Sequence, residues 1–192
     1  MDVLADIVGS LELRSQLYFR AELAAPFAVR VPDDHQRIRF HLAAAGRSWI
    51  GLPSGEGRFF EAGSLVLVPH GGAHILADAP TRTAPSLAAI RTGPAAGDPV
   101  LRIGTGAASA SLVCGHFAFD ELWLHPLLAS LPALLHLDDP NAAGFSWMPP
   151  LLDAVEAERT GGAAASDAVA RRLSEILFLQ LLRAALRDDA AR

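Results

Sequence analysis

Apolar residues at the start of the chain recur at the spacing of an amphipathic helix, which predicts a helix over residues 2–17. Its apolar positions are Val3, Leu4, Ile7, Val8, Leu11 and Leu13. From residue 17 onward the pattern changes to short apolar runs separated by turn residues. These runs predict strands over 17–23, 27–31, 37–42, 48–52, 58–60, 64–68 and 75–76, with a turn at Gly46. Many short strands at close spacing indicate a barrel or a sandwich.

The next segment, residues 78–110, is rich in Ala, Pro, Gly and Thr, and we interpret it as a long irregular insertion. Residues 110–119 return to the character of a strand. Because side chains alternate along a strand, Cys114 and His116 share one face, and Val113 and Phe117 point the other way.

After residue 120 the pattern becomes helical. A short helix is expected from His125 to about Leu131 and a second over 147–158, with a proline pair in its first turn and Gly161-Gly162 after it. Ser166 is a good N-cap for a last helix that runs to about Arg187. That helix is apolar nearly all round, so we expect burial on two sides, by the barrel and by a second copy of the chain. Burial wholly within its own domain is the alternative.

The pattern therefore predicts a mainly β fold, with a β-barrel over residues 1–120, an N-terminal helix included. A helical subdomain for support and dimerisation follows over residues 121–192. Hydrophobic residues make up 51% of the 192 residues, which is enough for a sizeable core.

Charge and cysteine content exclude several classes of protein. The net charge is -5 and no cluster of arginines forms a basic face, so we expect no direct binding of nucleic acid. The single cysteine, Cys114, excludes an intrachain disulfide and suits the cytoplasm. The first ten residues lack the basic start of a signal peptide. The longest apolar runs are too short to span a bilayer.

One segment carries a specific motif. Residues 63–74, GSLVLVPHGGAH, fit the second cupin motif, G-x5-P-x-G-x2-H, at each of these positions. In this interpretation Gly63 turns the chain into a buried strand, Pro69 and Gly71 form a tight bend, and His74 enters the next strand. The closing Asn of the motif is Asp78 here. The sequence thus resembles a cupin, which implies a jelly-roll-like β-barrel.

The first cupin motif is degraded. Counting back from Gly46 places Arg39 where the family has a glutamate ligand, with His35 and Asp33 at the positions of its two histidines. The usual metal set is therefore incomplete. An arginine in place of an acid would repel a cation and suits an anionic ligand better.

Five further segments narrow the resemblance. They are Phe40-His41-Leu42, 67–71, 114–117, 125–128 and 172–177. With the motif, they resemble the N-terminal ligand-sensing domain of AraC-type transcription regulators, from Leu4 to about Arg187. That resemblance implies an effector in the barrel, helices that support a homodimer, and DNA binding through a separate helix-turn-helix domain. We expect no such domain in this chain.

Two sets of residues are candidates for binding. Arg39, His41, Trp49 and His74 could line a ligand pocket: Arg39 through its fork of donors for a carboxylate or phosphate, Trp49 as an aromatic wall. The alternatives are an ion pair of Arg39 with Asp33, Asp34 or Glu61 and a core position for Trp49. His41, His74, Cys114 and His116 could hold Zn or another divalent transition metal. The alternative is a hydrogen-bonded His74 and a buried, inert Cys114.

Three functions follow from these residues. The first is a small-molecule sensor domain of an AraC-type regulator, with no catalytic residues. The second is a stand-alone metal-dependent cupin enzyme, a dioxygenase or an isomerase. The third is a regulator that acts through protein contacts alone.

Overall fold

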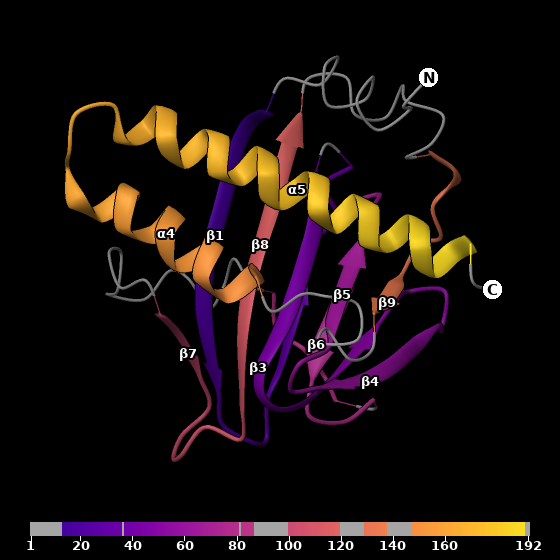
Figure 1. The fold of residues 1–192 in the computed structure, drawn as a ribbon. Helices are drawn as coiled ribbons and strands as arrows, with labels where there is room; N and C mark the ends of the chain where they lie inside the picture. Colours follow the sequence, from indigo (N-terminus) through magenta and orange to yellow (C-terminus); the bar gives the residue numbers. More distant parts are fainter. Residues whose placement is uncertain are drawn as a thin grey trace.

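The computed structural model describes residues 13–35, 37–80, 82–86, 100–119, 129–137 and 147–190. More of these residues lie in strands than in helices, and the strands are β1 (Leu13–Leu23), β2 (Ala28–Val31), β3 (Arg37–Gly51), β4 (Gly57–Glu61), β5 (Leu65–Val68), β6 (His74–Ala77), β7 (Val100–Ile103), β8 (Ala110–Phe119) and β9 (Leu135–Leu137). Two helices follow, α4 (Met148–Gly161) and α5 (Ser166–Ala190). Figure 1 shows the strands as one curled layer with both helices across its outer face.

The strands join in one nine-stranded sheet in the order β2-β6-β3-β8-β1-β7, with β4 and β5 also paired to β3 and β9 paired to β5. The expected strands are confirmed with small changes of boundary, except that the two expected over 37–42 and 48–52 form one continuous strand, β3. The expected N-terminal helix is wrong over residues 13–17, which begin β1 and pair with β8; residues 2–12 lie outside the described part. Pairing and packing with a neighbouring strand outweigh the helical spacing of a short apolar run.

The long strand β3 curls the sheet. Its first half pairs with β8 and β5, and its second half pairs with β4 and β6. The expected turn at Gly46 is wrong, because β3 continues through it. The register with β8 shifts between Ala43 and Ala45, and Gly46 adopts a φ of 71°. A bulge with a left-handed glycine bends a strand without ending it.

Each face of the sheet buries its own apolar cluster. The inner cluster includes Leu23, Val29, Ile50, Leu76 and Leu112. The outer cluster joins residues of β3, β5 and β8 to the two helices. There Phe117 stacks against Phe40 and against Phe178 of α5, with ring centroids 5.5 and 5.3 Å apart. As expected, Val113 and Phe117 lie on one face of β8 and Cys114 lies on the other.

The helical part differs from expectation in two details. Ser166 does not cap α5: it stands inside the helix, and its buried hydroxyl has no hydrogen-bond partner. The boundary falls at Ala165, whose φ is 64°. Gly162, also left-handed, ends α4 as expected. The strand β9 was not predicted. Of the short helix expected near residue 125, only Ala129 and Ser130 are described, and both are helical.

Neither of the described helices has the length and the apolar character needed to cross a membrane.

Candidate functional site

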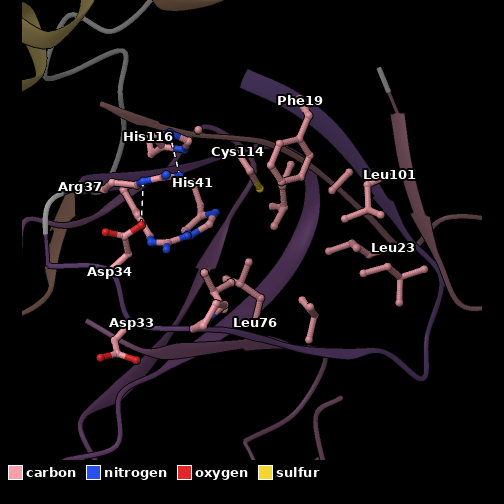
Figure 2. A pocket seen from close by; sticks show the side chains of 18 residues that line it. Phe19, Leu23, Asp33, Asp34, Arg37, His41, Leu76, Leu101, Cys114 and His116 are labelled. Atoms are coloured by element: carbon pink, nitrogen blue, oxygen red, sulfur yellow. Dashed lines mark hydrogen bonds and ion pairs between the residues drawn. The ribbon is translucent and has the colours of Figure 1, made fainter. Parts of the chain in front are cut away.

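The inner face of the sheet encloses a cavity of about 290 Å³. Most of its wall is apolar and comes from β1, β2, β6, β7 and β8. These residues are Phe19, Ala21, Leu23, Val29, Val31, Leu76, Leu101, Ile103 and Leu112. In Figure 2, Phe19, Leu23, Leu76 and Leu101 stand around one side of the cavity, and the labelled polar groups gather on the other.

The polar end of the cavity is built by one face of β3 and its neighbour β8. Arg37, Arg39 and His41 alternate along β3, so their side chains share the inner face. Across the ladder, Arg39 is paired with His116 and His41 with Cys114. The structure therefore brings together four of the expected site residues, Arg39, His41, Cys114 and His116, in one cavity wall.

Arg37 is held by two partners. Its Nε lies 2.7 Å from Asp34 Oδ2, and its Nη1 lies 3.1 Å from His116 Nε2 (Figure 2). Because a guanidinium only donates, His116 Nε2 must accept this bond. Arg37 is thus neutralised by Asp34 and keeps the lone pair of His116 occupied.

Arg39 differs from Arg37, because none of the described residues forms an ion pair with it. The expected alternative, a salt bridge to Asp33, Asp34 or Glu61, is not formed: Asp34 pairs with Arg37, and Asp33 lies 3.5 Å from His35 Nε2. The Arg39 Nε is buried without a hydrogen-bond partner. Burial lowers the pKa of Arg39, and Asp34 opposes this effect. An arginine stays protonated in proteins, so the cavity holds a cation with no ion-pair partner among the described residues.

His41 and His74 form a buried hydrogen-bonded pair whose tautomers can be assigned. The His74 Nδ1 lies 2.9 Å from the Gly72 carbonyl, so this nitrogen must donate. Neutral His74 then accepts at Nε2, and the His41 Nε2, 2.9 Å away, donates to it. The remaining nitrogen, His41 Nδ1, is a bare acceptor, buried and without a partner.

Both histidines are neutral at pH 7. Burial lowers the pKa of His74 to about 4, and it lowers the pKa of His41 well below the usual value, with His74 and Arg39 adding to the effect. The folded state therefore binds fewer protons than the unfolded state below about pH 6.5, and acid destabilises it.

We expect the free energy of unfolding to fall by about 3 kcal/mol between about pH 7.5 and about pH 5.5, since each histidine contributes about 1.4 kcal/mol per pH unit below its unfolded pKa. Urea denaturation at several pH values measures this. In the double variant His41→Phe/His74→Leu most of that slope should disappear. A wild-type profile that is flat over this range would contradict the assignment of two buried neutral histidines.

The expected metal ligands do not fit a metal well. Among the described residues, no group of three or more His, Cys, Asp or Glu side chains could hold a metal ion. His116 accepts from Arg37, and burial raises the pKa of the Cys114 thiol, which disfavours the thiolate that a metal needs. Arg39 adds a positive charge to the same wall. The metal site stays a prediction that this geometry does not favour.

Trp49 and His74 do not line this cavity. They line a second hollow of about 520 Å³, on the other side of β3, together with Arg30, Leu52, Glu56 and Ile75. Trp49 packs edge-on against Phe59, with centroids 5.1 Å apart. His74 nevertheless reaches the first cavity's wall indirectly, through its bond to His41.

Several lining residues were missed from the sequence. Arg37 precedes Arg39 and His41 at strand spacing, so alternation alone could have identified it. Leu101 and Ile103 belong to β7, which lies within the presumed irregular insertion and pairs with β1 in parallel. No local pattern marks that pairing.

The fold and the site can now be compared with known proteins. The family model described as Cupin matches residues 2–187, so the chain belongs to the cupin family. No curated protein matches the sequence.

Solved structures with a similar fold include three chains. ToxT from Vibrio cholerae O395 is 7% identical with a TM-score of 0.44, over 91% of this chain and 54% of that one. Wild-type ToxT from V. cholerae strain SCE256 bound to unsaturated fatty acid is 11% identical with a TM-score of 0.42, over 88% and 53%. The protein YhaK from Escherichia coli is 12% identical with a TM-score of 0.38, over 66% and 42%. The chain thus spans about half the length of the chains it matches, and the likeness concerns the fold alone.

Proposed function

We propose that this chain is the effector-sensing domain of an AraC-type transcription regulator, and that its effector is a small amphipathic carboxylate. The observation that carries the proposal is the division of the cavity into an apolar wall and an end that holds Arg39, a cation with no ion-pair partner among the described residues and with a buried Nε that lacks a hydrogen bond. The resemblance of the sequence motifs to AraC-type sensing domains supports the regulatory role.

The two ends of the cavity suit a ligand that combines an anionic group with an apolar group. An anion beside Arg39 would satisfy the buried Nε and the charge, and a carboxylate matches the planar fork of a guanidinium. The apolar wall would bury an alkyl or aryl group, at about 0.8 kcal/mol for each methylene removed from water. Neither chemistry alone fills the site.

The contacts that connect the cavity to helix α5 through β8 support a sensing role. On β8, Cys114 and His116 face the cavity, and the adjacent Phe117 packs on Phe178 of α5. A ligand that shifts β8 would therefore also displace α5.

On helix α5, Val169 and Ile176 lie two turns apart and are 40% and 49% exposed. We propose that they belong to the face through which a homodimer forms, in the cytoplasm, with DNA bound by a separate domain.

The metal-dependent enzyme is the less supported alternative. The cupin family includes enzymes as well as ligand-binding domains, so membership does not decide between them. The engaged lone pair of His116 and the neutral Cys114 thiol favour an organic ligand over a metal.

Calorimetric titration of the chain with octanoate and with octanol tests the proposal. We expect octanoate to bind with one site per chain and octanol to bind about tenfold more weakly or not at all, because a charge-assisted hydrogen bond contributes about 1.5–3 kcal/mol. Equal affinity for octanoate and octanol, or binding of neither, would contradict the proposal that the effector carries a carboxylate. Binding of neither would favour the account in which the domain works through protein contacts alone.

A further inference from the structure

Two residues that line the cavity, two positions apart on β3, each carry a buried polar atom with no hydrogen-bond partner among the described residues. Arg39 Nε is a buried donor without an acceptor, and His41 Nδ1 is a buried acceptor without a donor. The side chain of His41 is only 4% exposed. Buried polar atoms without partners are uncommon in native proteins, because each costs free energy. Two of opposite kind on one cavity wall point to a ligand.

The acceptor role of His41 Nδ1 is set by hydrogen bonds to groups that do not line the cavity. The Gly72 carbonyl sets the tautomer of His74, and His74 sets that of His41. Neither ring gains a proton near neutral pH, so Nδ1 cannot become a donor. It therefore discriminates between ligands: a second carboxylate oxygen placed against it would be repelled, and a hydroxyl would be bound.

From this pair of atoms we infer that the effector carries a hydroxyl group beside its carboxylate, with the hydroxyl proton donated to His41 Nδ1. The inference rests on the proposed carboxylate site and deepens it. The carboxylate oxygens meet the guanidinium of Arg39, and the hydroxyl on the adjacent carbon meets the ring two residues along the strand. An apolar α-hydroxy acid combines these groups. Solvent does not reach Nδ1, so a bound ligand would have to supply the missing donor.

A ligand series in the wild-type protein tests the inference without any variant. The probes are octanoate, α-hydroxyoctanoate and α-methoxyoctanoate, titrated calorimetrically under one set of conditions. The methoxy compound keeps the ether oxygen as an acceptor and loses the proton. We expect the hydroxy acid to bind about tenfold more tightly than octanoate, and the methoxy acid no more tightly than octanoate.

The variant His41→Phe should reduce the preference for the hydroxy acid to about onefold, and Arg171→Ala, on the exposed side of α5, should leave it unchanged. If octanoate and α-hydroxyoctanoate bind equally to the wild type, the hydroxyl inference is wrong and the carboxylate proposal stands. If none of the three acids binds, the carboxylate proposal fails first. If the methoxy acid binds as tightly as the hydroxy acid, an acceptor is recognised and the role given to His41 is wrong.

Discussion

Replacing Arg39 with methionine should weaken the binding of octanoate about 10- to 100-fold, since the carboxylate loses its charge-assisted partner. Calorimetric titration of the wild type and the variant measures the ratio. The variant should be as stable as the wild type or more so, because it removes a guanidinium whose Nε is buried without a partner.

A matched control separates this local effect from the loss of one positive charge. Arg47 lies on the same strand, exposed, with its guanidinium 3.5 Å from the centre of the Phe59 ring and outside the cavity. Arg47→Met should leave the affinity for octanoate within about twofold, because an exposed charge is screened by salt. Equal losses in the two variants would show that general electrostatic attraction, and no specific contact, holds the anion.

Gly71→Ala should destabilise the fold by about 3 kcal/mol or more, and Gly72→Ala should change stability by less than about 0.5 kcal/mol. Gly71 has a φ of 64°, and a Cβ there would lie 1.9 Å from the Asp34 carbonyl oxygen and 2.5 Å from that of Arg37. At Gly72 a Cβ would meet no atom within 4 Å, and its φ is not left-handed. Urea denaturation of both variants measures the difference.

The same glycine is tied to the cavity. Gly71 accepts a backbone hydrogen bond from Asp34, whose carboxylate holds Arg37 at the polar end. Where Gly71→Ala still folds, it should therefore weaken octanoate binding as well, whereas Gly72→Ala should not. Similar stability in the two variants would contradict the close approach of Asp34 and Arg37 to the turn.

The cupin motif was the most predictable part of the fold. Its positions are decided locally: Gly63 and Gly71 both have left-handed φ values, and the residues between Gly63 and Pro69 form the buried strand β5. A position that needs a left-handed backbone favours glycine, so such positions can be recognised in the sequence, as Gly63 and Gly71 are here. The partners β1 and β7, by contrast, meet across nearly eighty residues, and no local pattern records their register.

The bulge in β3 explains why Trp49 does not line the same cavity as Arg39 and His41. Before the bulge, the odd-numbered residues Arg39, His41 and Ala43 face the interior. After the bulge the phase is reversed: the even-numbered Ile50 lies in the inner cluster, and Trp49 faces outward. An extra residue moves every later side chain to the opposite face of a strand. Alternation therefore predicts the site up to residue 43 and fails beyond it.

A crystal structure of the chain with α-hydroxyoctanoate would show directly where the ligand binds. We expect the carboxylate within hydrogen-bond distance of the Arg39 guanidinium and the alkyl chain among Leu76, Leu101 and Ile103. A ligand bound instead in the hollow beside Trp49, or a cavity wall that keeps Arg39 without an anionic partner in the complex, would contradict this expectation.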